Sequence, residues 1–559
     1  MKFSDIFKIC ATMNLIVFAA AMLASIANAA PTAATTTATT TASVSVTTTA
    51  SASPTVCANG FKYLGKTVGY ADVFSSIRYA EKAVRFSPPV AVSRPRTEQF
   101  YNATITPNAC VQNHLDSSFP AGTVISEDCL FLNIHKPHNA TSELLPVWVY
   151  IHGGTFTSGG IASILYDGSH ILQTRSDIII VTISYRLGVF GFSASEELAA
   201  KGALNLGLLD QEAAFHWIQK NIWYFGGDPT RVTATGQSAG GISLGTLLTS
   251  RGGNNVLFHQ VGLQSGSAFT FAAPISFSQP FFNSLVSTFN CTSASDAVSC
   301  LKTVNATLLQ AAGSQYSYYQ PVVDGVFLTQ APYVALRQGL FRKVPLLAGD
   351  VKDDGLIFIP STNETIAKAD FATIISQQFA SLPVDDLAFL NATTYANYAP
   401  PVATSWGLGA GNFTGDYRHK CNDNLAIKLF AQYGLPVHKY LLSTCGTAFA
   451  YNYGYTKSPL PALHGCDICF VFNDPTCFYT AAQAELGVAM SNAWADFAAG
   501  KLNQNSLGWE PYTLANPTEI VFNIGNGTNF ESILDDGGEP KCEGLWEAGS
   551  LTYSLPVNF

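Results

Sequence analysis

A serine between two glycines is the clearest candidate for chemistry in this sequence. Ser238 lies in the stretch GQSAG, residues 236–240, after a strand-like run and before a helix-like one. A nucleophile elbow places its serine on such a strand-to-helix turn, where small neighbours allow a sharp bend and leave the hydroxyl exposed. The motif alone also fits an ordinary glycine-rich turn, but this context favours a nucleophile.

A serine nucleophile needs a histidine base, and the base needs an acid to orient it. After a nucleophile elbow, the acid and then the histidine follow in chain order. Of three downstream histidines, His419 lies in a charged, surface-like stretch and His438 in a strand-like run. His464 lies in a loop bounded by proline and glycine, from which a base could project, so we predict it as the base.

The acid is predicted in residues 343–358, which read as a strand followed by an acidic turn. Asp354, directly before Gly355, is the preferred candidate, with Asp353 and Asp350 as alternatives. An acidic turn of this kind can also be a solvated loop without a catalytic role.

Hydrolysis of an ester would also need donors for the negative charge that develops on the carbonyl oxygen. The stretch HGG, residues 152–154, follows the predicted strand Leu145–Ile151 and fits the glycine-rich donor loop of esterases and lipases. The backbone N–H of Ala239 would be a further donor. A plain glycine turn is the alternative interpretation of the HGG stretch.

The surrounding elements alternate between strand and helix. The apolar run Asp177–Tyr185 predicts a strand buried on both faces. Residues 208–227 show apolar side chains at helical spacing and end in two glycines. Together with the strand at residues 231–235 and the helix that begins at Ser238, this pattern predicts an α/β fold with a mostly parallel sheet.

Several stretches of the chain are similar to the type-B carboxylesterase/lipase family, which includes the cholinesterases. They occur in family order and include SEDCLFLNIHKP, IHGGTF, SYRLGVFGF, GQSAGG, LQSGSAF, PVVDG, DDG and LHGCD, and above all the long block from Asn205 to Gly241. The resemblance implies an α/β-hydrolase fold and ester hydrolysis without a cofactor, with Ser238 as nucleophile, Asp354 as acid and His464 as base. It also implies an oxyanion hole formed by the N–H groups of Gly154, Thr155 and Ala239.

Three residues depart from the family pattern at the site itself. Thr155 stands where a third glycine or an alanine is usual, which would make the pocket tighter or more polar. Gln237 stands where many members have glutamate, which removes a charge that could favour protonated His464. Asp354 replaces the commoner glutamate, so its shorter side chain needs a slightly different backbone position.

The cysteines are expected to form disulfides. The family pattern implies Cys110–Cys129 and Cys291–Cys300, while the partners of Cys57, Cys421, Cys445 and Cys542 stay open. In the fourth departure from the family, HGCDICFVFNDPTC, the residues His464, Cys466, Cys469 and Cys477 resemble a set of metal ligands. In a secreted chain disulfides are the better interpretation, and a catalytic histidine cannot also bind zinc, so no metal site is predicted.

The first residues predict export from the cell. Lys2 and Lys8 precede an apolar run too short to span a membrane, and small residues follow near Ala29, so residues 1–29 are expected to be a cleaved signal peptide. Residues 30–56 are rich in threonine, serine and alanine and predict a disordered linker before a catalytic domain at 57–559. Eight sequons predict N-linked glycans on surface loops, at Asn102, Asn139, Asn290, Asn305, Asn363, Asn391, Asn412 and Asn526.

The charge of the chain and the length of the Cys110–Cys129 loop limit which partners and substrates are expected. A formal charge of −9 spread without blocks argues against nucleic acid and anionic membranes as partners, and no later stretch is apolar enough to span a bilayer. Only 18 residues, 111–128, lie between Cys110 and Cys129, and none is tryptophan. Related lipases carry a longer lid there, and cholinesterases a tryptophan that holds a quaternary ammonium. We therefore expect an esterase for soluble or modest-chain esters, with an interfacial lipase or a non-catalytic interaction module as alternatives.

Overall fold

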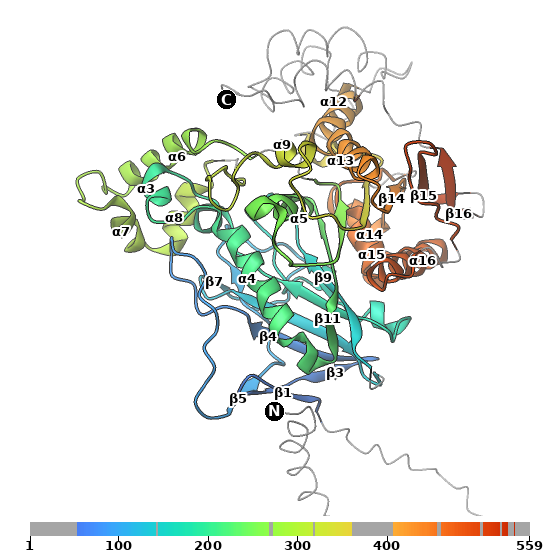
Figure 1. Cartoon of the computed structure of the whole chain (residues 1–559), viewed down its shortest axis with the longest axis horizontal. Helices are drawn as coiled ribbons and strands as arrows, with labels where there is room; N and C mark the ends of the chain where they lie inside the picture. Colours follow the sequence, from blue (N-terminus) through green and yellow to red (C-terminus); the bar gives the residue numbers. More distant parts are fainter. Residues whose placement is uncertain are drawn as a thin grey trace, which may run out of the picture.

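One large sheet organises the part of the chain that the structure describes (Figure 1). The computed structural model describes residues 53–140, 143–267, 272–316, 319–359, 406–454, 460–502, 507–525, 528–534 and Cys542. Within them the sheet has the strand order β16-β15-β14-β13-β12-β11-β9-β10-β8-β4-β3. The strands span Lys66–Val68 (β3), Ala71–Arg78 (β4), Phe131–Pro137 (β8), Leu145–Ile151 (β9), Ile179–Ile183 (β10), Gly227–Gln237 (β11), Gln260–Gln264 (β12), Leu346–Val351 (β13), Val437–Leu442 (β14), Thr518–Gly525 (β15) and Thr528–Leu534 (β16).

The centre of this sheet is parallel and its edges are antiparallel. Strands β10, β9, β11, β12, β13, β14 and β15 pair in parallel, whereas β8, β4 and β3 on one edge and β16 on the other pair antiparallel. Successive residues of β9 alternate between two hydrophobic cores: Val147, Val149 and Ile151 face one, Trp148 and Tyr150 the other. Burial on both faces explains why the central strands read as continuous apolar runs.

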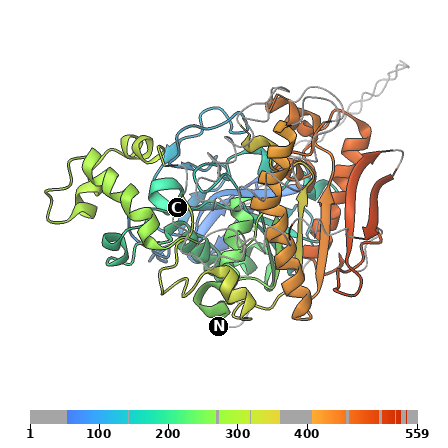
Figure 2. The ribbon, with the colours of Figure 1, turned by 90° about the horizontal axis from the view of Figure 1, so that it is seen from above.

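Helices cover both faces of the sheet. Helices α4 and α5 contribute to the first core, and α15 and α16 to the second. Figures 1 and 2 show α6, α7 and α8 gathered on one side of the sheet, away from β15 and β16. The helices span Gly188–Gly191 (α2), Glu196–Ala199 (α3), Leu206–Asn221 (α4), Ala239–Thr249 (α5), Ile275–Thr288 (α6), Ala297–Lys302 (α7), Ala306–Gly313 (α8), Pro332–Arg337 (α9), Trp406–Gly415 (α12), Cys421–Gln432 (α13), Thr447–Asn452 (α14), Cys466–Val471 (α15) and Ala481–Ala498 (α16).

The predicted elements around the candidate site are present with small shifts of their ends. Strand β9 has the predicted bounds, and β10 is shorter than the predicted run. Helix α4 ends at Asn221 and continues as a 3₁₀ turn, Ile222–Phe225, before Gly226 closes it with φ +89°. Strand β11 begins at Gly227, several residues before the predicted strand, because Gly227 pairs with Leu145 of β9. A register shift separates Gly227 from Val232. The arrangement confirms the predicted α/β architecture.

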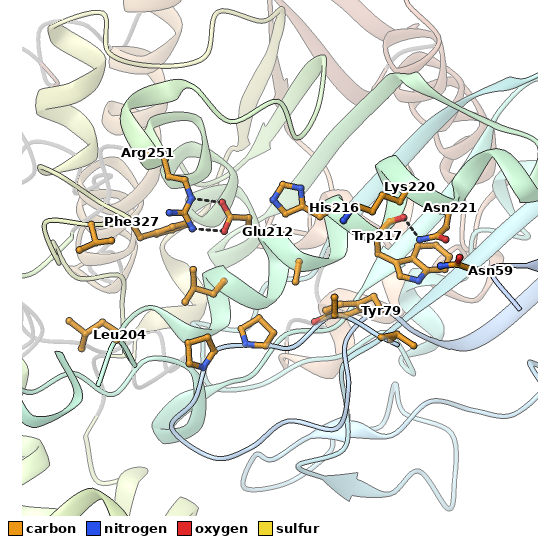
Figure 3. A pocket seen from close by; sticks show the side chains of 18 of the residues that line it. Asn59, Tyr79, Leu204, Glu212, His216, Trp217, Lys220, Asn221, Arg251 and Phe327 are labelled. Atoms are coloured by element: carbon orange, nitrogen blue, oxygen red, sulfur yellow. Dashed lines mark hydrogen bonds and ion pairs between the residues drawn. The ribbon is translucent and has the colours of Figure 1, made fainter. Parts of the chain in front are cut away.

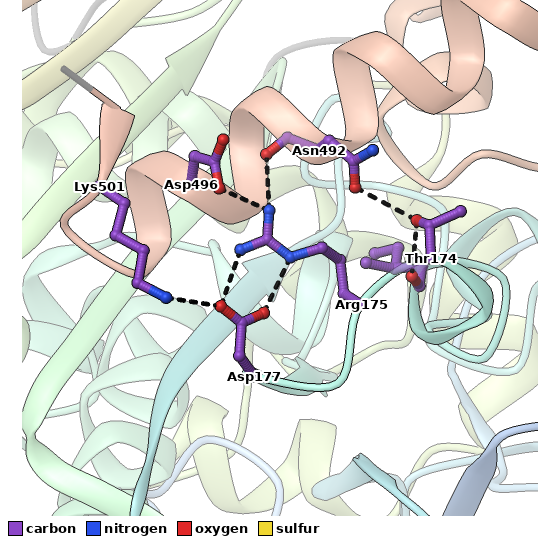
Figure 4. Close-up of polar contacts among 7 residues, drawn as sticks. Thr174, Arg175, Asp177, Asn492, Asp496 and Lys501 are labelled. Atoms are coloured by element: carbon purple, nitrogen blue, oxygen red, sulfur yellow. Dashed lines mark hydrogen bonds and ion pairs between the residues drawn. The ribbon is translucent and has the colours of Figure 1, made fainter. Parts of the chain in front are cut away.

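A polar cluster ties the segment just before β10 to α16 (Figure 4). Arg175 lies between two carboxylates: it donates to both oxygens of Asp177, at 2.8 and 3.1 Å, and to Asp496 at 2.5 Å. The Lys501 ammonium donates to Asp177 at 2.8 Å, and Arg175 also reaches the Asn492 carbonyl at 3.3 Å. This network holds helix α16 against the segment that leads into β10.

Smaller elements lie at the N-terminal side. Strands β1 (Thr55–Ala58), β2 (Phe61–Leu64) and β5 (Gln99–Asn102) form a separate sheet, and β6 (Ala109–Cys110) pairs with β7 (Ile125–Ser126). Strand β1 begins at Thr55, two residues before Cys57 and within the range 30–56 expected to be a linker. The predicted signal peptide lies outside the described residues, as does nearly all of the linker. Among the described helices, none has the length and apolar character needed to cross a bilayer.

Candidate active site

Ser238 occupies a sharp turn between the end of β11 and the start of α5. Its backbone has φ +56° and ψ −123°, a conformation that a residue with a side chain rarely adopts. The Ser238 N–H donates to the Gln264 carbonyl at the end of β12, 2.8 Å away, and Ile242 N–H donates to the Ser238 carbonyl. Such strain in a well-tethered residue is typical of functional positions.

The glycines of the GQSAG stretch are required by close backbone approach. A Cβ on Gly240 would lie 2.1 Å from the Ile151 carbonyl oxygen, and one on Gly236 would lie 2.6 Å from the Gly240 carbonyl carbon. Strand β9 and helix α5 therefore touch through these positions, which holds the turn in place. A nucleophile elbow has this construction.

The predicted base and acid meet in the structure. His464 Nδ1 lies 2.5 Å from Asp354 Oδ1, and both residues are buried. Their two loops are joined directly, because Asp353 N–H donates to the Ala462 carbonyl and Ala462 N–H donates to the Asp353 carboxylate at 2.8 Å. Asp353 is therefore engaged in holding the histidine loop, whereas Asp354 contacts the imidazole.

The other nitrogen of His464 contacts Gln237. The side-chain Nε2 of Gln237 lies 3.1 Å from His464 Nε2, and among the described residues no hydrogen bond joins His464 to the Ser238 hydroxyl. With the Nδ1 proton directed at Asp354, Nε2 carries the lone pair and the Gln237 amide donates to it. Gln237 is thus hydrogen-bonded to His464 Nε2, the atom that would have to receive the proton of Ser238 if His464 acts as the base.

His419 corrects an expectation from the sequence. It is buried rather than on a charged surface, and its ring stacks on His464 with 4.5 Å between centroids. The reason is a π-helical turn, Asp416–Lys420, between α12 and α13, which changes the helical register and turns this residue inward. Burial lowers the pKa of His419 to about 3, so it is neutral beside His464 at ordinary pH.

The buried acids near Asp354 differ in charge. Burial alone would raise the pKa of Asp354, but the interaction with His464 and the hydrogen bond from it outweigh burial and lower that pKa below its usual value. Burial raises the pKa of Asp350 well above its usual range, and this carboxyl shares a hydrogen bond with Asp423. An acid that favours its neutral form cannot stabilise an imidazolium, so Asp350 is a poor alternative to Asp354.

The predicted donor loop lies against the elbow. A Cβ on Gly153 would lie 3.0 Å from Ser238 Cβ, which places Gly153 directly beside the serine. The loop folds on itself, with the Gly154 carbonyl accepting from Thr157 N–H and Ser158 N–H, and Gly154 and Thr155 both have positive φ. Ala239 is the first residue of α5, so its N–H has no acceptor inside the helix.

His152 supports this loop without a catalytic feature of its own. Its ring stacks on Tyr185 at 4.5 Å, and the Tyr185 hydroxyl donates to the His152 carbonyl at 2.9 Å. Burial lowers the pKa of His152 to about 4, which keeps the ring neutral. A neutral, stacked ring at the start of the loop fixes the direction of the backbone that follows.

Disulfides hold the histidine loop and the protein around it. Both implied pairs, Cys110–Cys129 and Cys291–Cys300, are present. The pairs that the sequence left open are Cys421–Cys542, Cys445–Cys466 and Cys469–Cys477, and Cys57 is also disulfide-bonded. Because Cys466 and Cys469 both lie in α15, directly after His464, the two bonds anchor the segment that carries the candidate base.

One group of side chains in the described part has metal-ligand chemistry. Ligand atoms of Asp354, His419 and His464 lie within 4.8 Å of one another. However, Asp354 and His464 already engage each other, and a metal there would displace the proton between them. The arrangement fits a base with its orienting acid and a neutral neighbouring ring.

The sequons differ in exposure. Asn102, Asn139, Asn290 and Asn305 are exposed, while Asn412 is half-buried within α12 and its sequon residue Thr414 is buried. The side chain of Asn305 also caps α8 by accepting from Thr307 N–H. Asn412 thus departs from the expected surface loop, because it lies inside a helix. Asn363, Asn391 and Asn526 lie outside the described residues.

The fold and the site together define an α/β-hydrolase. The centre of the sheet is parallel, a strained serine lies on a strand-to-helix turn, and later loops bring an acid and a histidine together. Residues 58–536 match the model of the carboxylesterase family, and the chain belongs to that family as a serine carboxylesterase. It is 34% identical over 388 residues to "Secreted lipase 1" of Botryotinia fuckeliana (strain B05.10), covering 64% of this chain and 66% of that protein.

Two further relatives match over more of their length. "Secreted lipase ARB07186/07185" of Arthroderma benhamiae (strain ATCC MYA-4681 / CBS 112371) is 30% identical, over 81% of this chain and 85% of that protein. "Carboxylesterase 1D" of Rattus norvegicus is 29% identical, over 85% of this chain and 90% of that protein.

Proposed function

We propose that this chain is a secreted carboxylic-ester hydrolase that acts through Ser238, His464 and Asp354. The proposal rests chiefly on the 2.5 Å contact of His464 with Asp354 beside a strained serine on an elbow. The disulfides and the names of two secreted relatives support an extracellular location.

The proposed reaction has two steps. Ser238 Oγ forms a bond to the ester carbonyl carbon, His464 Nε2 takes the hydroxyl proton, and the N–H groups of Gly154, Thr155 and Ala239 receive the charge on the carbonyl oxygen. The carbon–oxygen bond to the alcohol then breaks, and the alcohol leaves with the proton from His464. His464 then takes a proton from water as the water oxygen bonds to the acyl carbon. The bond from that carbon to Ser238 Oγ breaks, His464 returns the proton to Ser238, and the acid is released.

Gln237 adds a condition to the first step. His464 Nε2 can accept the Ser238 proton only after the Gln237 amide has released it, because one lone pair serves one donor. A rotation of that side chain is therefore part of the proposed catalytic cycle.

For the substrate, the short disulfide loop favours soluble or modest-chain esters. The loop is held down on the body of the protein: Gln112 exchanges two hydrogen bonds with Gly159, at 2.9 and 3.0 Å, and Ile164 N–H donates to the Ser118 carbonyl at 2.9 Å. The alternative is a triacylglycerol lipase with the same triad, which the names of the two fungal relatives favour.

Labelling tests the activity and the nucleophile together. The protein should take up a serine-directed organophosphate and hydrolyse p-nitrophenyl butyrate, and Ser238→Ala should lose both, with kcat about 10⁶-fold lower. A wild-type protein that does neither would be a non-catalytic interaction module, and full activity in Ser238→Ala would disprove the nucleophile.

Substrate class is tested with p-nitrophenyl esters of increasing chain length, with and without an emulsion. We expect kcat/KM to be highest for short and medium chains and not to rise when an interface is added. A steep increase at the interface for long chains would identify a lipase instead.

A further inference from the structure

A second cavity lies along helix α4, apart from the candidate active site (Figure 3). Its volume is about 770 Å³, and it lies between α4 and the segment that contains Pro88 and Pro89. Tyr63 and Tyr79 contribute to its lining, and neither Ser238, Asp354 nor His464 does. Small-molecule sites in proteins have volumes of roughly 300–1,000 Å³, so this cavity is large enough for a complete ligand.

The cavity is long because one face of α4 lines it over several turns. Lining residues recur at helical spacing from Leu209 through Ala213 and Trp217 to Asn221. At 1.5 Å per residue, this face runs for about 18 Å. Phe327 closes one end, and Asn59 and Phe61 lie towards the other, as Figure 3 shows for the labelled Phe327 and Asn59. An elongated ligand with an apolar body fits such a groove.

The two carboxylates that line the cavity already accept hydrogen bonds from other groups of the protein. Glu212 accepts two hydrogen bonds from Arg251, both 2.9 Å, and a further one from Asn255. Asp324 accepts from Asn205 at 2.9 Å and from the backbone N–H groups of residues 326–328. Neither acid is therefore available to hold a cationic ligand.

One cationic side chain at the cavity, that of Lys220, has no ion-pair partner among the described residues. Lys220 is exposed at the rim, and no ion pair in the described part of the chain engages its ammonium. His216 lies one turn earlier on the same face of α4 and is also exposed (Figure 3). The groove thus combines an apolar interior with a free positive charge at its edge.

We propose that this groove binds a single-chain anionic amphiphile, a fatty acid, with its carboxylate at Lys220 and His216 and its chain along the apolar face of α4. The acid is of the chemical class that hydrolysis of acyl esters releases. The site does not depend on the proposed esterase activity, because its residues are separate from the candidate triad.

Binding of sodium laurate below its micelle concentration, measured by isothermal titration calorimetry on the full protein, tests this site. Dodecyltrimethylammonium, with a chain of the same length and the opposite charge, is the control ligand. We expect laurate to bind at least tenfold more tightly, and its affinity to fall when salt is raised, because exposed charges are screened. Equal affinity for the two head groups would overturn the proposal.

Two variants locate the ligand within the molecule. Lys220→Gln should weaken laurate binding about two- to fivefold, the range expected for one exposed charge pair, while Lys66→Gln on β3, outside the groove, should leave it unchanged. Ala213→Trp should fill the groove and abolish this binding, with hydrolysis of p-nitrophenyl butyrate retained as the sign of correct folding. Laurate binding that persists in folded Ala213→Trp would place the ligand elsewhere and refute the assignment.

Discussion

Both ring nitrogens of His464 are engaged, and their partners have different consequences. The Asp354 carboxylate at Nδ1 fixes the tautomer that leaves a lone pair on Nε2. The Gln237 amide then occupies that lone pair. In the proposed mechanism, the contact to Asp354 orients the histidine as a base, and the contact to Gln237 has to open before His464 Nε2 can accept the serine proton.

Replacing Gln237 with glutamate should change the pH dependence of hydrolysis. A carboxylate next to His464 Nε2 stabilises the protonated imidazole, so the base stays protonated up to a higher pH. We expect the acid limb of kcat/KM for p-nitrophenyl butyrate to move upward in Gln237→Glu by about one pH unit. Gln237→Met, which removes the donor and adds no charge, is the matched control and should move the acid limb less than Gln237→Glu does. If the pH profiles of kcat/KM for Gln237→Glu and the wild type superimpose, residue 237 has no electrostatic effect on His464.

The two neighbouring aspartates of the acidic turn should respond differently to the same substitution. Asp354→Asn removes the charge that orients His464 and supports its protonated form, so kcat should fall about 10⁴-fold. Asp353→Asn retains an oxygen that can accept from Ala462 N–H and should lower kcat less than about tenfold. Steady-state kinetics of the two variants decides between the candidates, and the reverse order would identify Asp353 as the acid.

At the scale of elements, the site is assembled from the carboxyl ends of parallel strands. The end of β11 carries Ser238, and the turn after β13 carries Asp354. His464 comes from the long connection that follows β14, so a disulfide and a β-bridge replace the direct support of a strand. This connection is the part of the site that depends most on its crosslinks.

Removing the Cys445–Cys466 bond should therefore affect stability and activity together. In the double variant Cys445→Ala/Cys466→Ala the free energy of unfolding should be about 3 kcal/mol lower. Its kcat should also fall as temperature rises, because the loop that carries His464 is no longer crosslinked. The Cys291→Ala/Cys300→Ala variant removes a bond next to α7 and should be destabilised with kcat unchanged. Thermal unfolding and kcat measured over the same temperature range separate the two effects, and equal losses of kcat would contradict a local role.

Local patterns in the sequence predicted the elements better than the contacts between them. Strand β9 followed from its β-branched and aromatic residues between a proline and two glycines, and helix α5 from the stretch that follows the elbow motif. The link between Cys421 and Cys542 spans 121 residues and left no local signal. Nor could periodicity place His419, because the π-helical turn that buries it depends on packing, and the side-chain direction of Gln237 depends on the distant His464.

At the scale of the whole molecule, several carboxyl groups are buried together beneath the candidate site. Burial raises the pKa of Asp423 to about 7, and its carboxyl shares a hydrogen bond with Asp350 and accepts from Gly266 N–H at 3.0 Å. Burial also raises the pKa of Asp467, which accepts from Gln264 at 2.7 Å. The folded protein therefore binds protons that the unfolded chain would release.

This cluster should make the folded protein less stable as pH rises towards neutrality. A carboxyl whose pKa is raised on folding stabilises the native state fully below its unfolded pKa of about 3.9, and that stabilisation is lost as pH rises through the folded pKa. Between pH 5 and pH 7, Asp423 should therefore lower the free energy of unfolding by up to about 1.4 kcal/mol per pH unit.

Asp423→Asn tests the assignment, because the amide keeps an oxygen for Gly266 N–H and cannot ionise. Denaturant unfolding of the wild type and the variant at pH 5 and pH 7, with disulfides intact, gives the four free energies needed. The advantage of the variant should be greater at pH 7 than at pH 5, since only the wild-type carboxyl acquires a buried charge over that interval. A constant offset between wild type and Asp423→Asn at both pH values would mean that Asp423 does not titrate in this range.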